Sequence, residues 1–190
     1  PGSASPPAED ERRNKIVYET GKACSELLKL GIKPLDIVTF ESFENSITML
    51  NAVGGSTNGI LHLLAMANEA GINLTYDDFE RIRKKTPHVA DMKPGGNYVM
   101  NSLDKIGGIP LIMKKLLDKN LIHGDCLTVT GKTIKENLDE LMISEVPEQQ
   151  IVKPIEQPIH EVGTAVILKG SLAPDGAVIK TAGVEMTEFT

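Results

Sequence analysis

The sequence has few aromatic residues and almost no cysteine. Phe, Trp and Tyr make up 4% of its 190 residues, and tryptophan is absent. The two cysteines, Cys24 and Cys126, lie far apart in the chain. Two thiols exclude a disulfide framework and a four-thiolate metal site built from this chain alone. We expect both to be reduced and mostly buried, as in a cytoplasmic protein.

The chain also lacks an excess of positive charge and a long apolar run. Acidic residues (26) outnumber lysine and arginine (20), the formal net charge is −6 and the pI is about 5.3. Such a chain has no electrostatic footprint for nucleic acid or for an anionic membrane. Its most apolar stretch, Ile60–Ala67, contains His62 and is far shorter than the roughly 20 residues of a membrane helix. We therefore expect a soluble protein with neither partner.

The first ten residues, PGSASPPAED, contain neither an initiator methionine nor a charged segment followed by an apolar one. A secretory signal requires that second pattern. We expect Pro1 to be a cut edge and the chain to be a piece of a longer protein.

Helix patterns dominate up to residue 146. Prolines and acidic residues suit the first turn of a helix, which predicts one from Ser3 or Ser5 to Gly31. Its apolar stripe comprises Ile16, Ala23, Leu27, Leu28 and Leu30. Capping residues, glycines and apolar spacing predict further helices over 39–53, 56–70, 75–85, 97–106, 110–119 and 133–141.

Strand patterns are short and lie mainly near the end of the chain. The β-branched segment Cys126–Thr130 predicts one strand. Three prolines in a polar stretch predict a linker over 147–158. Residues 164–168 and 177–181 predict two strands joined by a turn at Ala173–Gly176. This β domain is expected to be incomplete, because about 40 residues with two or three strands bury too little apolar surface to fold alone.

The segment Asn51–Asn58, with the sequence NAVGGSTN, is the strongest candidate for a binding site. Two glycines and three polar side chains precede an apolar helix, whose free N–H groups and dipole can hold a carboxylate or a phosphate. Ser56, Thr57 and Asn58 would act as neutral donors. On spacing alone, an ordinary tight corner between two helices is the more common explanation.

Other polar features are weaker candidates. The segment 124–133, GDCLTVTGKT, has six residues between its first glycine and its Gly-Lys-Thr, where a phosphate-binding loop has four, so nucleotide binding by Lys132 is not favoured. His123 and Asp125 could form an acid–base pair or two metal ligands, but a structural pair at the start of a strand is favoured. His62 is typical of a core or interface histidine rather than a ligand.

Seven segments, in order along the chain, carry a family resemblance. They are PGSASPPAEDERRNKIV, NAVGGSTNGILHLLAMANEAGI, LTYDDFERI, TPHVADMKPGGNYVM, GGIPLIMKKLLD, HGDCLTVTGKTIKENL and PIHEVGTAVILKGSLAPDGAVIKTAGV. Together they resemble the family of dihydroxy-acid and 6-phosphogluconate dehydratases, and they cover nearly the whole chain. The first segment and HGDCLTVTGKT resemble the branched-chain amino-acid members rather than the 6-phosphogluconate ones.

The resemblance implies a hydro-lyase that removes water from 2,3-dihydroxy-3-methyl acids and yields the 2-oxo acid precursors of valine and isoleucine. It implies an iron–sulfur cluster (2Fe–2S or 4Fe–4S) as Lewis acid on the leaving 3-hydroxyl, a magnesium ion that orients the substrate, and a base that removes the C2 proton. A metal suits this reaction because hydroxide is a poor leaving group. A cytoplasmic homodimer is implied as well.

The resemblance further implies that the chain is the middle of such an enzyme. The family's cluster cysteines, its magnesium-binding acidic residues and its modified lysine lie before the position that matches Pro1. A further metal carboxylate and the serine base lie beyond Thr190. We therefore expect no catalytic or metal-ligating residue in this chain, no cluster or magnesium held by it alone, and no activity of the isolated chain.

The expected contribution of the chain is part of the substrate pocket wall. The helix-start argument and the resemblance both point to Gly55, Ser56, Thr57 and Asn58 as substrate-binding residues. Their expected role is to form hydrogen bonds with the substrate or with a metal-ligand side chain. His123 is a weaker candidate.

These observations predict an α/β fold. The resemblance implies that residues 1–146 form the helix-rich part of a three-layer α/β/α domain, 147–158 a linker, and 159–190 the start of a swivelling β-barrel-like domain. A sugar-acid dehydratase, of the 6-phosphogluconate or aldonate type, is the alternative within the family. A non-catalytic helical interaction module is the alternative from another class.

Overall fold

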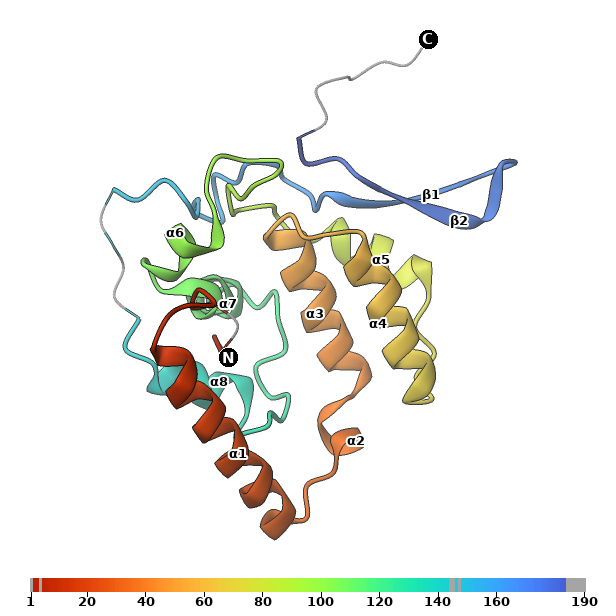
Figure 1. Cartoon of the computed structure of the whole chain (residues 1–190). Coiled ribbons are helices and arrows are strands. Elements are labelled where there is room, and N and C mark those ends of the chain that lie inside the picture. Colours follow the sequence, from red (N-terminus) through yellow and green to blue (C-terminus); the bar gives the residue numbers. More distant parts are fainter. Residues whose placement is uncertain (1, 4, 144–145, 147, 184–190) are drawn as a thin grey trace.

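The computed structural model describes residues 2–3, 5–143, 146 and 148–183 (Figure 1). Pro1, the first position of the predicted linker and the residues from 184 to Thr190 lie outside these. The helices are α1 (Arg12–Leu30), α2 (Pro34–Ile37), α3 (Phe40–Ala52), α4 (Asn58–Glu69), α5 (Tyr76–Arg83), α6 (Met100–Asp104), α7 (Gly108–Asp118) and α8 (Ile134–Glu140), and the strands are β1 (Ala165–Gly170) and β2 (Ala173–Lys180). This helix-rich chain with a small sheet is compatible with the predicted α/β class. None of the described helices is long and apolar enough to cross a membrane.

Three helices begin at threonines, as the sequence predicts. Thr39, Thr75 and Thr133 are the N-caps of α3, α5 and α8, each in a capping box. In α8, the Thr133 hydroxyl accepts a hydrogen bond from the amide of Glu136 at 3.2 Å, and the Glu136 carboxylate accepts one from the amide of Thr133 at 2.7 Å. The sequence pattern alone predicts this cap, because both hydrogen-bonding residues lie within one helical turn.

The first helix begins later than predicted. Its first residue is Arg12, whose amide donates to the Asp10 carboxylate at 2.9 Å, so an aspartate rather than a serine satisfies the helix start. Ser5 is buried, and its hydroxyl accepts from the amide of Ile109 at 3.3 Å at the start of α7. The predicted end at Gly31 is confirmed, with a left-handed φ of 70°.

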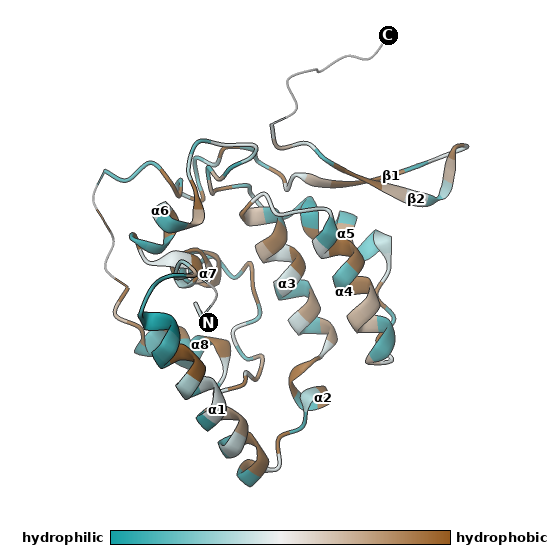
Figure 2. Ribbon diagram, in the orientation of Figure 1, coloured by the Kyte–Doolittle hydropathy of each residue, from teal (hydrophilic) through white to brown (hydrophobic). Residues whose placement is uncertain are grey.

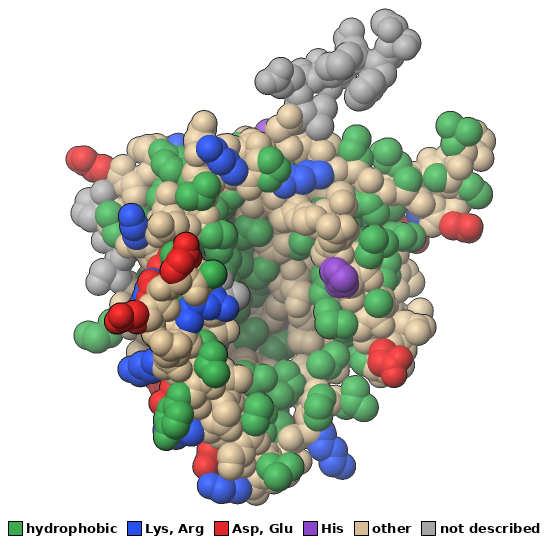
Figure 3. Space-filling model, in the orientation of Figure 1, with side chains coloured by type: hydrophobic (Ala, Val, Ile, Leu, Met, Phe, Trp, Pro, Cys, Tyr) green, Lys and Arg blue, Asp and Glu red, His purple; other side chains and the backbone are tan. Residues whose placement is uncertain are grey.

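The apolar stripe of α1 has no cover within the described part of the chain. None of its residues is buried, and Leu28 and Leu30 are 85% and 62% exposed. Figure 2 shows apolar residues along this helix, and Figure 3 shows the hollow beside it. A groove of about 560 Å³ separates α1 from Pro110 and Leu141. Cys24 lines it and is exposed, so its predicted burial is wrong, whereas Cys126 is half-buried.

Two other predicted elements differ in the structure. Cys126–Thr130 is not a strand: Leu127 forms an isolated bridge with Thr133, and the amide of Thr128 donates to the carbonyl of Lys132 at 2.9 Å across a tight turn. No described strand lies beside this segment, and β-propensity without a pairing partner does not make a strand. The helix predicted over 97–106 shortens to α6.

The core consists of two clusters of buried apolar residues. One gathers around α7 and includes Leu103, Ile112 and Leu116. Ile151 and Val152, in the predicted linker, also pack into this cluster. The second cluster joins α3, α4 and α5 to Ala165 at the start of β1, and it includes Phe43, Ile47, Ile60 and Phe79. The β1–β2 pair is therefore attached to the helices of the second cluster.

The two predicted strands form an antiparallel pair, but the predicted turn is wrong. Ala173–Gly176 lies inside β2, and the connection is Ser171–Leu172. A two-residue connection is the shortest common hairpin turn. An irregularity in register near Gly170 accompanies it.

A buried asparagine joins the start of β1 to α3. Asn51 is 1% exposed; its carboxamide nitrogen donates to the carbonyl of Ile47 at 3.0 Å, and its oxygen accepts from the amide of Ala165 at 3.2 Å. A Cβ on Gly163 would lie 2.3 Å from that oxygen, so only glycine fits there. Arg83 fixes Gly163 from the other side through two hydrogen bonds of 3.0 and 3.1 Å. We call this junction of residues 163–165 with α3 and α5 the seam.

Two histidines stack beside the seam. The rings of His88 and His160 have centroids 5.3 Å apart and an angle of 15° between their planes, and the His88 amide donates to the His160 carbonyl at 2.9 Å. His88 is 5% exposed, and its Nδ1 has no hydrogen-bond partner among the described residues. Burial, followed by the proximity of His160, lowers the pKa of His88 to about 4.

We predict that Asn51→Leu destabilises the chain. The substitution leaves the buried amide of Ala165 without an acceptor, which costs about 1–3 kcal/mol of unfolding free energy. Urea unfolding measures this loss. The matched control is Asn68→Leu on the exposed surface of α4, which should change the unfolding free energy by less than about 0.5 kcal/mol. Equal effects of the two substitutions would contradict the role assigned to Asn51.

We also predict a pH dependence of stability that arises from His88. Its pKa is about 4 in the folded chain against 6.5 when unperturbed, so the unfolded chain binds the proton first. The contribution of His88 to the free energy of unfolding is complete above pH 6.5. It declines as the pH falls from 6.5 to 4 and is absent below pH 4, a total loss of roughly 3 kcal/mol. Urea unfolding at several pH values should give a shallower decline for His88→Asn and His88→Phe. Profiles parallel to that of the original chain would refute this assignment.

Candidate functional site

Residues 55–58 lie on the turn between α3 and α4, next to the seam. Gly54 has a left-handed φ of 61°, and a Cβ there would lie 2.6 Å from Nε2 of His88. The amide of Gly55 donates to the carbonyl of Leu50 at 2.7 Å and closes the end of α3. Gly54 and Gly55 therefore form the turn. Residue 54 is a glycine because a side chain there would collide with the His88 ring.

The turn presents uncommitted hydrogen-bond donors. Ser56 and Asn58 are exposed, and Gly55 and Thr57 are half-buried. The first-turn amides of α4 are already used: Asn58 donates to the Ser56 hydroxyl at 3.2 Å, and Gly59 to the Ser56 carbonyl at 2.9 Å. Within the described structure, the amides of Ser56 and Thr57 and the side chains of Thr57 and Asn58 make no hydrogen bond. The free donors thus precede the helix, and they suit the oxygens of a carboxylate or a hydroxyl group.

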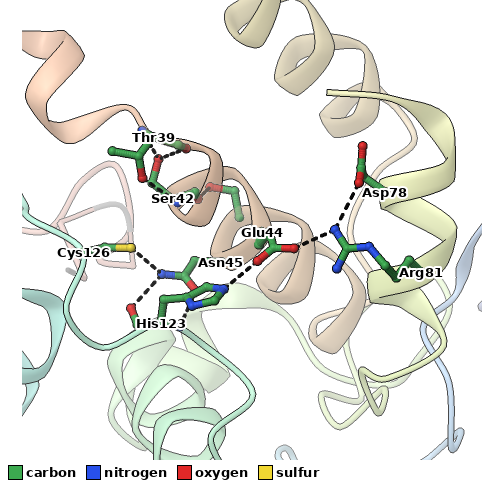
Figure 4. Close-up of polar contacts among 9 residues, drawn as sticks. Thr39, Ser42, Glu44, Asn45, Asp78, Arg81, His123 and Cys126 are labelled. Carbon is green, nitrogen blue, oxygen red and sulfur yellow. Dashed lines mark hydrogen bonds and ion pairs between the residues drawn. The ribbon is translucent and has the colours of Figure 1, made fainter. Parts of the chain in front are cut away.

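His123 pairs with Glu44 and not with Asp125, so the predicted pair is wrong. Nε2 of His123 lies 2.6 Å from one Glu44 oxygen, and the Arg81 guanidinium lies 2.6 Å from the other (Figure 4). Arg81 also contacts Asp78 at 3.0 Å. Glu44 on α3 and Arg81 on α5 lie far from His123 in sequence, which is why local spacing did not reveal them.

Asn45 binds the backbone of His123. Its carboxamide nitrogen donates to the His123 carbonyl at 2.9 Å, and its oxygen accepts from the His123 amide at 2.7 Å. The same nitrogen lies 3.5 Å from the Cys126 sulfur. Burial, followed by the nearby Asp125 and Glu41 carboxylates, raises the pKa of the Cys126 thiol. A raised pKa lowers the fraction of thiolate, which is the nucleophilic and metal-ligating form.

The remaining candidate residues, Lys132 and His62, do not belong to this group of contacts. Lys132 forms an ion pair with Glu140 at 2.5 Å, and the neighbouring amide of Thr130 points to the Thr128 hydroxyl at 3.4 Å. The segment therefore binds itself rather than presenting amides to a phosphate. His62 is exposed on α4, so it is not a core histidine, and its place at an interface stays a prediction. Among the described residues, no group of three His, Cys, Asp or Glu side chains is arranged to hold a metal ion.

Comparison with known proteins shows that the chain matches two models of one protein family. The N-terminal family model of dihydroxy-acid/6-phosphogluconate dehydratases matches residues 1–137, and the C-terminal model matches residues 150–190. The seam joins the parts of the chain that the two models match.

The chain is also similar to curated relatives from archaea. It is 60% identical to the dihydroxy-acid dehydratase of Sulfolobus acidocaldarius over 189 residues, which are 100% of this chain and 34% of that protein. It is 59% identical to that of Sulfurisphaera tokodaii over 186 residues, 98% of this chain and 33% of that protein. The chain thus spans about a third of the length of these relatives. Since the first model alone covers more than half of the sequence, the chain belongs to the dihydroxy-acid/6-phosphogluconate dehydratase family.

Proposed function

We propose that the protein containing this chain removes water from 2,3-dihydroxy-3-methyl acids and yields the 2-oxo acids that precede valine and isoleucine. The observation that carries this proposal is the 59–60% identity to dihydroxy-acid dehydratases along essentially the whole chain. Identity at this level to these enzymes favours the dihydroxy-acid branch over the sugar-acid branch. The non-catalytic module has no comparable support.

The reaction defines what a pocket wall must do. A proton leaves C2, the C3–O bond breaks, hydroxide takes up a proton and leaves as water, and the enol becomes the 2-oxo acid. The carboxylate and both hydroxyl groups of the substrate accept hydrogen bonds. In the proposal, Ser56, Thr57 and Asn58 donate to these oxygens and orient the substrate. The resemblance implies that the base is a serine beyond Thr190, so the proposal assigns these three side chains to binding and not to transfer of the C2 proton.

The resemblance implies an iron–sulfur cluster and a magnesium ion, which would polarise the leaving hydroxyl and orient the substrate. The described residues of this chain do not fit either group. Cluster ligands are thiolates, and neither cysteine of this chain belongs to a group of three metal-ligating side chains among the described residues. Magnesium takes carboxylate oxygens, and no suitable group of them is arranged among the residues described. The proposal therefore places these ligands elsewhere in the parent polypeptide.

For the parent we propose a three-layer α/β/α domain that includes residues 1–146, a linker at 147–158, and a swivelling β-barrel-like domain that begins at 159. The exposed Leu168 and Leu172 of the two-stranded hairpin support this, because exposed apolar side chains favour cover by further structure. We also propose a cytoplasmic homodimer. Leu61 and Met66 on α4 are more than half exposed, and exposed apolar groups of this kind favour a face that is covered in the assembled protein.

Turnover by the parent polypeptide tests the proposal. Under anaerobic conditions it should convert 2,3-dihydroxy-3-methylbutanoate to the 2-oxo acid, with 6-phosphogluconate converted much more slowly. Thr57→Val and Asn58→Ala should each lower kcat/KM roughly tenfold, because each removes one hydrogen bond of about 1.4 kcal/mol to the substrate.

Asn68→Ala is the matched control, since Asn68 lies at the other end of α4 and is exposed. It should leave kcat/KM unchanged. Absence of turnover by the parent would overturn the proposed activity. Normal turnover with kcat/KM unchanged by Thr57→Val and Asn58→Ala would overturn only the role of the loop.

A further inference from the structure

A small cavity lies between α3, α5 and the chain that follows α7, apart from residues 55–58. Its volume is about 170 Å³, and none of residues 55–58 lines it. Its polar lining, seen in part in Figure 4, comprises Glu44, Thr48, Arg81, Lys85, Asn120 and His123.

Thr48 is the unusual member of this lining. Three buried polar residues recur at every third position along α3, namely Asn45, Thr48 and Asn51. Asn45 binds the backbone of His123, and Asn51 binds the start of β1. Thr48 is 3% exposed, yet its hydroxyl makes no hydrogen bond among the described residues. The hydroxyl is not among the fully buried atoms without a partner, which are Nδ1 of His88 and Oγ1 of Thr164. It therefore opens onto the cavity and can donate a hydrogen bond to a group that enters there.

The charges of the lining are uneven. Both oxygens of Glu44 are engaged, one by Arg81 and one by His123, each at 2.6 Å. Asp78 contacts Arg81 from outside the cavity at 3.0 Å. Lys85 also lines the cavity, and it forms no ion pair with any described residue. Its ammonium group can only donate hydrogen bonds, and no carboxylate of the lining is paired with it.

The side chain of Asn120 adds a further donor. It follows α7 with a left-handed φ of 55°, and its carboxamide makes no hydrogen bond within the described part of the chain. Ile82 and Leu121 provide apolar wall. The volume of 170 Å³ corresponds to about five or six water molecules in the liquid, at roughly 30 Å³ each. This is enough for a phosphate or a short aliphatic acid.

We propose that this cavity binds a small oxyanion, either a phosphate or the carboxylate of a short aliphatic acid. Lys85 is the ion-pair partner, and Thr48 and Asn120 donate hydrogen bonds. The proposal is independent of the dehydratase activity, because it rests on residues outside the turn at 55–58.

Titration of the 190-residue chain with inorganic phosphate, acetate and 2-methylpropanoate tests the proposal. Ionic strength is held constant with chloride, and backbone amide resonances report binding residue by residue. We expect saturable binding in the millimolar range that shifts the amides of Thr48, Lys85 and Asn120. Tighter binding of phosphate identifies a phosphate site, and tighter binding of 2-methylpropanoate than of acetate identifies an aliphatic carboxylate site.

Two variants and one control make the test specific. Lys85→Met should weaken binding at least tenfold, and Thr48→Val at least threefold. Lys84→Met is the control, because Lys84 pairs with Glu80 at 3.6 Å and does not line the cavity. Lys85 is exposed, so its variant should fold even if Thr48→Val does not. Absence of saturable binding, or equal effects of Lys85→Met and Lys84→Met, would overturn the proposal.

Discussion

The buried carboxamide of Asn51 determines where the C-terminal strands meet the helices. Its donor and its acceptor are both used inside the core, so the side chain has one orientation, and the start of β1 can approach α3 in one register only. Gly163 fits against it because it has no Cβ. One turn further along, Gly54 reverses the chain against the ring of His88. The turn at 55–58 therefore lies beside the seam that joins the regions matched by the two family models.

This arrangement gives the turn a rigid backbone and free side chains. The backbone is fixed by the bond from Gly55 to Leu50 and by the packing of Gly54 on His88, whereas Thr57 and Asn58 keep their donors. A backbone that is already held in place loses little conformational entropy when a ligand binds. Binding sites are common where two structural units meet, because neither unit must sacrifice its own core to form the pocket. The position at the seam thus suits a pocket wall better than a corner inside one unit would.

The sequence predicts those features whose partners are close in the chain. Thr39 and Thr133 cap helices through residues within one turn, and Gly31 ends a helix through its own backbone, so local patterns suffice. The segment Cys126–Thr130 fails because a strand needs a neighbour that composition does not supply. The stripe of α1 is present as an amphipathic pattern, yet none of its residues is buried, because spacing along one helix does not specify the neighbour that would cover it. The pair of Glu44 and His123 has no local signal, since its members come from distant segments.

The polar residues of α3 connect these observations. A helix that packs two clusters of apolar residues usually keeps polar groups off its buried side, because each one must be satisfied. Asn45 and Asn51 meet that condition by holding other segments of the chain, and both are therefore explained by folding alone. Thr48 lies between them on the same side of the helix, and its side chain makes no hydrogen bond among the described residues. Valine has the same shape, so packing alone does not require a hydroxyl at this position. The hydroxyl opens onto the cavity and is not one of the fully buried atoms without a partner. An acceptor in the cavity would give it the hydrogen-bond partner that the fold does not.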